Sequence, residues 1–199
     1  MFQFIYWDPD IIALQLGGLA LRWYAVCWAT GLLLAYLIVQ HLYKKQHLAP
    51  EKFDPLFYYC FIGILAGARL GHCLFYQPEY FLSHPVEMIL PIRQMADGWR
   101  FVGYEGLASH GGTLGLIVGL WLYVRKHKVP ILQVLDNIAL ATPITACLIR
   151  VGNLVNSEIV GKVTDVPWAF IFPRNGDLLP RHPGQLYEAV AYLIFFFVG

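Results

Sequence analysis

Four polar side chains follow an apolar run over residues 131–149: Arg150, Asn153, Asn156 and Glu158. At about 1.5 Å per residue, a helix of this length almost crosses the hydrocarbon core of a bilayer. A charged side chain at the bilayer centre costs at least about 2.5 kcal/mol, so such residues usually face a bundle interior or a wet cavity and mark function. If the helix continues, Arg150, Asn153 and Asn156 share one face. The stretch therefore predicts one polar patch.

A simpler alternative is that Arg150 reaches the headgroups from a helix end, with the asparagines capping the helix and Glu158 as a surface partner. For an isolated arginine this interpretation is the better one. Here three further polar side chains, together with Gly152 and Gly161, lie in the same short stretch. Because anchoring does not require this cluster, we favour a functional patch.

A second group of polar residues interrupts the apolar run over residues 56–76. Arg69 and His72 are three residues apart and share a helix face, and Gly67 and Gly71 beside them permit close helix packing. The pair either faces the bundle interior or reaches the membrane interface, and both interpretations stay open.

His110 begins a third apolar run and is followed by Gly111 and Gly112. A helix start favours the neutral imidazole that a general base needs, and the glycines would let a substrate approach the ring. A lone interfacial histidine is more often a plain surface residue, but several arginines at the same depth suggest a phospholipid phosphate held by charge-assisted hydrogen bonds. For Arg181, ordinary headgroup anchoring stays an alternative.

The composition is that of a polytopic membrane protein. Of the 199 residues, 58% are hydrophobic and 14% charged, and the mean hydropathy is +0.54, which predicts an all-α membrane helical bundle. The net charge of +1 and the short basic clusters do not indicate nucleic acid as a partner. We expect neither metal nor cofactor, because the cysteines lie in apolar runs without metal-ligand spacing: Cys27, Cys60, Cys73 and Cys147.

The apolar runs predict four spans and a fifth, incomplete one, over residues 24–43, 56–76, 107–124, 131–149 and 189–198. Basic clusters after the first and third runs lie on one side, which predicts that this side is cytoplasmic and that the N-terminus is outside. Residues 1–20 read as an interfacial segment. Because about ten apolar residues cannot span a bilayer, the chain looks truncated at its C-terminus.

This topology predicts a single membrane-embedded domain over residues 1–199, with an extracytoplasmic loop at 77–106 and a small extracytoplasmic cap at 162–180. It also places five separate segments toward the outer leaflet. These segments carry Tyr24, Arg69 with His72, His110, residues 150–158 and residues 181–188. We expect one site at that depth.

Taken in order, these residues resemble the signature of the bacterial prolipoprotein diacylglyceryl transferases, and the matching elements span nearly the whole chain. They are Asp8-Pro9, Trp23-Tyr24, Gly67-Ala68-Arg69-Leu70-Gly71, His110-Gly111-Gly112, Arg150-Val151-Gly152-Asn153 through Asn156, Glu158 and Gly161, and Arg181-His182-Pro183 with Gln185-Leu186-Tyr187-Glu188.

The resemblance implies a seven-span bundle in the bacterial inner membrane, with a periplasmic N-terminus and a site toward the outer leaflet. It implies transfer of the diacylglyceryl group of phosphatidylglycerol to the cysteine thiol of a prolipoprotein signal peptide, with glycerol phosphate released. The implied partners are phosphatidylglycerol, this signal peptide and the lipid bilayer. The implied catalytic residues are His110, Tyr24 and Arg150, and the implied substrate-binding residues are Arg69, Arg150, Asn153, Asn156, Glu158, Gly161, Arg181 and Glu188.

The sequence departs from the family pattern at three points. The signature usually begins Gly-Arg and has phenylalanine after the asparagine, where this chain has Ile149 and Leu154. Family members also carry a further arginine in a later span, beyond the last residue here.

The residue types suit the implied chemistry. A free thiol has a pKa of about 8.5, so a base such as His110 would raise its thiolate fraction. The leaving phosphate gains charge in the transition state, which Arg150 would stabilise more than the ground state. The residues leave open whether His110 or Tyr24 acts as the base.

Two other function classes remain. In a transporter or channel, the buried arginines and histidines would relay protons or bind an anion along a path through both leaflets. A non-catalytic lipid-binding scaffold would keep the arginines but tolerate loss of His110. The concentration of polar residues toward one leaflet favours an interfacial enzyme.

Overall fold

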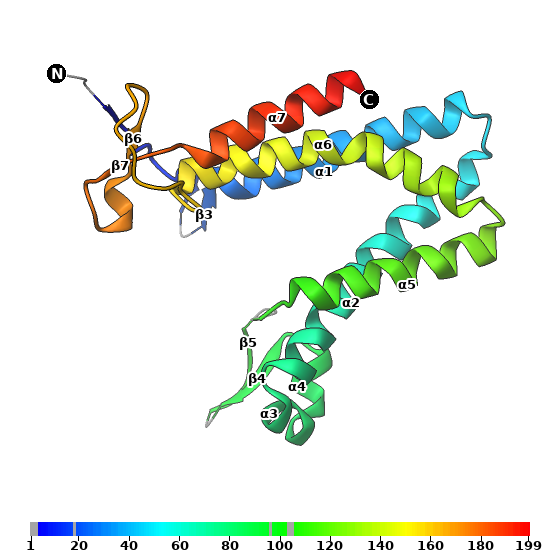
Figure 1. Cartoon of the computed structure of the whole chain (residues 1–199). Helices are drawn as coiled ribbons and strands as arrows, with labels where there is room; N and C mark the ends of the chain where they lie inside the picture. Colours follow the sequence, from blue (N-terminus) through cyan, green and yellow to red (C-terminus); the bar gives the residue numbers. More distant parts are fainter. Residues whose placement is uncertain (1–3, 18, 96, 103–105) are drawn as a thin grey trace. The chain divides into compact units, whose positions relative to one another are not determined.

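The computed structural model describes residues 4–17, 19–95, 97–102 and 106–199, and most of them are helical. Ala96 and residues 103–105 of the predicted loop at 77–106 lie outside the described part. The longer helices are α1 (Trp23–Lys45), α2 (Phe53–Phe75), α5 (Ser109–His127), α6 (Ile131–Asn156) and α7 (Gly184–Val198) (Figure 1). The shorter ones are α3 (Pro78–Ser83), α4 (Pro85–Ile89), η1 (Pro50–Lys52) and η2 (Pro173–Asn175).

A helix forms at each predicted apolar run. Within the described residues, three helical stretches are long and apolar enough to cross a membrane: Trp23–Lys45, Pro50–Phe75 and Ile131–Asn156. The predicted spans at 107–124 and 189–198 form α5 and the shorter apolar α7, which are not among these three. The chain is therefore a helical membrane protein, and its total of five or seven spans stays a prediction.

The prediction of an all-α fold was incomplete, because short strands form between the helices. β1 (Ile5–Tyr6) pairs in parallel with β6 (Phe170–Ile171), which pairs antiparallel with β7 (Pro180–Arg181). Two hairpins pair β2 (Ile12–Leu16) with β3 (Leu19–Arg22), and β4 (Ile92–Met95) with β5 (Gly98–Phe101). Residues 1–20, predicted as one interfacial segment, thus contribute β1, β2 and the start of β3 within their described part, because backbone groups that no helix satisfies pair with neighbouring segments.

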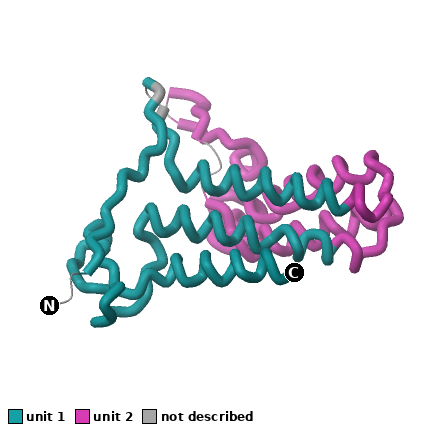
Figure 2. The backbone as a smooth tube through the Cα atoms, turned by 90° about the horizontal axis from the view of Figure 1, so that it is seen from above, with its two compact units in different colours: residues 1–42, 135–199 teal, residues 43–134 magenta. Residues whose placement is uncertain are grey.

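The chain divides into two compact units, residues 1–42 with 135–199 and residues 43–134 (Figure 2). The first unit sets α1, α6 and α7 side by side (Figures 1 and 2). Thr145 of α6 donates its hydroxyl to the carbonyl of Gly31 on α1 at 2.9 Å. A Cβ added at Gly31 would lie 3.2 Å from Thr145 Cα, so the glycine permits this close approach.

The predicted cap at 162–180 folds together with the N-terminal residues of the first unit. Its core is Leu154, Phe170 and Phe172, against which Trp7 and Val160 pack. Trp7 donates its indole N–H to the carbonyl of Leu154 at 2.8 Å, and its ring lies 5.4 Å from that of Phe170. The strand β1 and this indole therefore fix the cap to the end of α6.

In the second unit, α2 and α5 lie side by side through glycines (Figure 1). The glycines lie four residues apart on each helix: Gly63, Gly67 and Gly71 on α2, and Gly111, Gly115 and Gly119 on α5. A Cβ on Gly67 would lie 2.7 Å from Gly115 Cα, and one on Gly71 would lie 2.8 Å from Gly111 Cα. The structure confirms close packing at Gly67 and Gly71 and uses Gly111 for the same contact.

A small extension follows α2 and consists of α3, α4, β4 and β5 (Figure 1). Glu87 holds it together: its side chain is buried, and its carboxylate accepts the backbone N–H of Gln94 at 3.0 Å and the Tyr80 hydroxyl at 2.5 Å. The Gln94 N–H, followed by the Tyr80 hydroxyl, lowers the pKa of Glu87 below its ordinary value. The ionised Glu87 carboxylate therefore connects α3 and α4 to the β4–β5 hairpin.

Candidate functional site

The predicted polar patch lies at the end of α6. The helix continues through Asn156, so Arg150 and Asn153 share one helix face, as their spacing predicts, and Asn156 lies three residues further on, at the helix end. Beyond it, Ser157 has φ 59° and Ile159 has φ 55°, both in the left-handed region. This sharp turn brings the chain back on the helix end, where the backbone N–H of Glu158 donates to the carbonyl of Asn153 at 2.9 Å.

Glu158 is the centre of a hydrogen-bond network at this turn. Asn153, which is 5% exposed, donates its amide to one Glu158 carboxylate oxygen at 3.0 Å. Asn156 donates to the other oxygen at 3.2 Å. A carboxylate that accepts from two amides is fixed in orientation, so the two asparagines do more than cap the helix.

Arg150 joins this network to α7. Its Nε lies 2.6 Å from Glu188 Oε2, and its Nη1 donates to Asn153 Oδ1 at 3.5 Å. The Arg150 side chain is only 25% exposed. The anchoring alternative predicts Glu158 as the carboxylate partner of Arg150. The structure shows Glu188 as this partner instead. A guanidinium carries five donors, so these contacts leave donors for a further anion.

Gly161 and Arg181 lie just beyond this network and join the turn to the cap. The Gly161 N–H donates to the carbonyl of His182 at 2.9 Å, and Arg181 Nη1 donates to the carbonyl of Gly161 at 3.4 Å. Arg181 also pairs with Asp177 at 2.7 Å, and this hydrogen bond lowers the pKa of Asp177. A Cβ on Gly161 would lie 2.6 Å from the His182 oxygen, so the contact requires glycine.

Tyr24 lies in the first turn of α1 and packs on α6. A Cβ added to Gly152 would lie 3.0 Å from Tyr24 Cδ2 and 3.3 Å from Tyr24 Cα. Gly152, within the patch sequence, therefore lets the tyrosine approach the helix that carries Arg150.

The sequence did not indicate that Gln185 supports this network. Its side chain is 1% exposed and donates to the backbone carbonyl of Glu158. Gln185 Oε1, Ser157 Oγ and Asn156 Oδ1 are buried and form no hydrogen bond within the described part of the chain. Gln185 lies in the first turn of α7, just after His182-Pro183. This position in the sequence does not show what the Gln185 side chain contacts.

Arg174 was also missed. It pairs with Asp8 at 3.0 Å and donates to the carbonyls of Pro9 and Val155. These contacts join the N-terminal segment, the cap and the end of α6. No local pattern could have found them, because Arg174 and Asp8 lie at opposite ends of the chain.

Arg69 lies in the second unit, where it is 7% exposed. Its Nη2 donates to the carbonyl of Glu87 at 2.6 Å and its Nε to that of Met88 at 3.1 Å. The guanidinium lies 4.7 Å from the centre of the Phe81 ring. Arg69 therefore holds α3 and α4 against α2, a role that the sequence did not predict.

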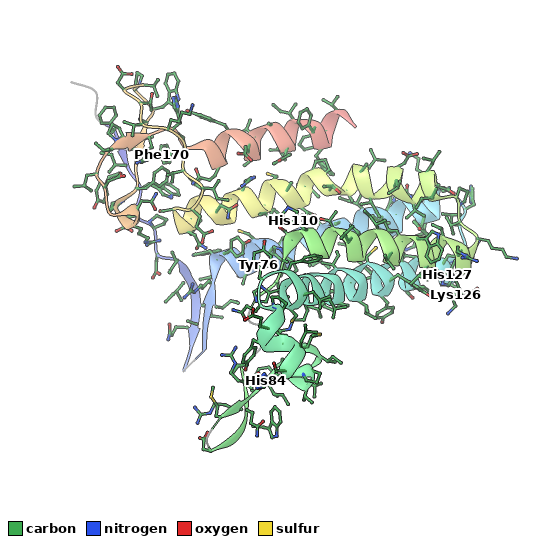
Figure 3. The ribbon with its side chains drawn as sticks, turned by 60° about the horizontal axis from the view of Figure 1, so that its bottom comes forward. Tyr76, His84, His110, Lys126, His127 and Phe170 are labelled. Atoms are coloured by element: carbon green, nitrogen blue, oxygen red, sulfur yellow. The ribbon has the colours of Figure 1, made fainter. Side chains whose placement is uncertain are left out.

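His110 is the second residue of α5 and is exposed (Figure 3). Gly111 and Gly112 after it are buried against α2, where a Cβ on Gly112 would lie 3.5 Å from that of Ala68. Close helix packing thus accounts for Gly111, where a Cβ would lie 2.9 Å from Gly71 Cα, but not for Gly112. The approach of a substrate to the His110 ring stays a prediction.

The predicted residues therefore fall into two sets. The first unit brings together Tyr24 on Gly152, the network of Arg150, Asn153, Asn156, Glu158 and Glu188, and the neighbouring pair of Gly161 and Arg181. The second unit holds His110 and Arg69. Their convergence on one site stays a prediction. Within the described residues, no group of three His, Cys, Asp or Glu side chains could hold a metal ion.

The apolar helices and the charged network at a helix end define the class: a helical membrane protein with a polar site at the end of an apolar helix. The family described as prolipoprotein diacylglyceryl transferase matches residues 11–199. The chain belongs to this family, which confirms the resemblance.

Two relatives illustrate the match. A phosphatidylglycerol–prolipoprotein diacylglyceryl transferase of Bacteroides fragilis is 58% identical over 195 residues, which cover 98% of this chain and 70% of the relative. One of Tolumonas auensis is 45% identical over 193 residues, covering 96% of this chain and 70% of the relative. These names indicate a transferase and do not favour the transporter alternative.

Proposed function

We propose that this protein transfers the diacylglyceryl group of phosphatidylglycerol to the cysteine thiol of a prolipoprotein signal peptide. A thioether bond forms to the glyceryl carbon, the bond from that carbon to the phosphate oxygen breaks, and glycerol phosphate leaves. The observation that carries the proposal is the Arg150 network, because it sets a guanidinium with donors to spare at the end of an apolar helix.

Arg150 is the residue we assign to the phosphate. Its pairing with Glu188 and Asn153 fixes the guanidinium without using all of its donors. The phosphate changes from a diester with one negative charge to a monoester approaching two, so a fixed cation stabilises the transition state more than the substrate. The buried acceptors on Ser157, Asn156 and Gln185 suit hydroxyl groups such as those of a glycerol headgroup.

The thiol needs a base, and we assign this role to His110, with Tyr24 as its hydrogen-bonding partner or alternative. Transfer of the thiol proton to the imidazole produces the thiolate that attacks the glyceryl carbon. This assignment requires the first turn of α5 and the first turn of α1 to face the same substrate. It is supported by the match of both residues to the family signature.

We further propose that the protein lies in the bacterial inner membrane with its N-terminus in the periplasm. The basic residues in the last turns of α1 and α5 support this orientation, because basic clusters favour the cytoplasmic side. The start of α5 and the end of α6 are then both on the outer side, where phosphatidylglycerol and the exported signal peptide meet.

Variants in purified protein test these roles. His110→Asn should lower the transfer rate by about 10²- to 10⁴-fold, the usual contribution of a general base. Arg150→Ala should lower it as well, because the leaving phosphate loses its cation. His41→Asn is the matched control, because His41 is an exposed histidine on α1. Wild-type turnover by a folded His110→Asn protein would rule out the base assignment.

A further inference from the structure

A groove with a glycine floor runs between α2 and α5 in the second unit. Its volume is about 460 Å³, and it is lined from Tyr58 to Leu70 on α2 and from Gly115 to Leu122 on α5. At 1.5 Å per residue, the α2 wall is roughly 18 Å long. One leaflet of a bilayer contributes about 15 Å of hydrocarbon. The groove is therefore about as long as the hydrocarbon layer of one leaflet, which is the region that an acyl chain occupies.

The groove exists because glycines form its floor while larger side chains form its walls. Gly63, Gly67, Gly115 and Gly119 all belong to the lining. On the walls, Ile62 is 61% exposed and Val118 is 54% exposed. The lining is almost wholly apolar, so the groove suits an apolar occupant.

A second pocket of about 330 Å³ adjoins the groove. Its lining is Tyr59, Trp121, Leu122, Arg125 and Lys126, and it shares Tyr59 and Leu122 with the groove. The Arg125 guanidinium lies 4.9 Å from the centre of the Trp121 ring. Within the described part of the chain, no carboxylate pairs with Arg125 or Lys126.

The apolar groove and the adjoining cationic pocket match the apolar part and the anionic part of a single amphipathic molecule. We propose that this surface binds an anionic phospholipid of the bilayer, with an acyl chain in the groove and the phosphate at Arg125 and Lys126. Trp121 suits the boundary between them, since tryptophan is enriched at headgroup depth. Glu51 of η1 and Asp54 in the first turn of α2 lie outside both linings.

This site lies away from His110, the proposed base. Lys126 and His127 are at one end of α5 and His110 is at the other (Figure 3). The lipid proposed here therefore binds at the basic end of the α2–α5 pair and is not the lipid that reacts. Charge complementarity favours an anionic lipid over another helix, because a helix in the groove would leave the two cations without a partner.

Site-specific photocrosslinking tests the proposal. The chain carries p-benzoylphenylalanine in place of Val118, which lines the groove, or in place of Leu114, an exposed residue of α5 outside it. Each protein is reconstituted in vesicles of equal parts phosphatidylserine and phosphatidylcholine. Mass spectrometry of the crosslinked peptide then gives the ratio of the two lipids.

We expect position 118 to capture phosphatidylserine at least about fivefold over phosphatidylcholine, the preference that one basic side chain near the surface supplies. Position 114 should capture them in the bulk ratio. The double variant Arg125→Gln, Lys126→Gln should remove the enrichment, and Lys44→Gln, Lys45→Gln, with the same change in charge, should keep it. The bulk ratio at position 118, a crosslink there to protein, or equal losses in both double variants would overturn the proposal.

Discussion

At the scale of single residues, the site depends on side chains that hold one another. Glu158 accepts from Asn153 and Asn156, and Gln185 donates to its backbone carbonyl. Arg150 contacts both Asn153 and Glu188. Asn153 therefore links the Glu158 carboxylate at the turn to the Arg150 guanidinium on the helix. Loss of its side chain should leave each of these groups with one hydrogen bond fewer.

Asn153→Ala tests this link. The change removes a buried donor to Glu158 and an acceptor for Arg150, so we expect the protein to lose about 1–3 kcal/mol of stability, the cost of leaving buried polar groups unpaired. Thermal unfolding in detergent measures the loss. Asn175→Ala on η2, where the side chain is exposed, is the control and should leave the midpoint unchanged. Equal midpoints for both variants would show that the network contributes no stability.

At the scale of elements, α2 and α5 associate through backbone contact. Lipid is as apolar as the helix surfaces, so close packing rather than the hydrophobic effect holds such helices together. Gly67 lies directly on the backbone of α5, whereas Gly112 faces side chains at ordinary contact distance.

Gly67→Ala should therefore destabilise the second unit. The added methyl would lie 2.7 Å from Gly115 Cα, and relieving such a clash costs typically about 1–3 kcal/mol. Gly112→Ala is the matched control, because its methyl would meet Ala68 Cβ only at 3.5 Å. We expect a lower thermal midpoint for Gly67→Ala alone. A larger drop for Gly112→Ala would contradict the packing described here.

The extension after α2 should respond to acid through Glu87. Because the folded state lowers the pKa of this carboxyl, its ionised form stabilises the fold above the ordinary pKa of about 4.3, and the contribution is lost as pH falls through the folded value. Glu87→Gln should lower the thermal midpoint at neutral pH, and its difference from wild type should shrink in acid. Glu79→Gln, at an exposed site, is the control. A difference that grows in acid would have the wrong sign.

The sequence predicted the helices well, because apolar runs of span length and a three-residue spacing of polar groups are local patterns. Arg150 and Asn153 on one face are an example. The hairpins β2–β3 and β4–β5 are local, and they were missed because they lie in segments that were interpreted only as interfacial or as a polar loop. The strand β1 was missed because it pairs with β6 across most of the chain. The partners Glu188 for Arg150 and Asp8 for Arg174 were missed for the same reason: long-range contacts leave no periodic signal. The buried role of Arg69 depended on α3 and α4, which the polar loop did not indicate.

At the scale of the whole molecule, the two units carry complementary halves of the proposed chemistry. The first holds Arg150, the proposed cation for the leaving phosphate, and the second holds His110, the proposed base. Both residues stand at ends of apolar helices, which suits a reaction between a membrane lipid and a peptide that arrives at the membrane surface. The family match over residues 11–199 includes both units.

The most direct test of the account is transfer of a labelled diacylglyceryl group from phosphatidylglycerol to a signal peptide that carries the acceptor cysteine. The purified protein is used in detergent, and the same peptide with serine in place of cysteine is the control. We predict labelled cysteine peptide and no labelled serine peptide, because only a thiolate forms at neutral pH. No label on the cysteine peptide, with the protein shown to be folded, would contradict the proposed activity.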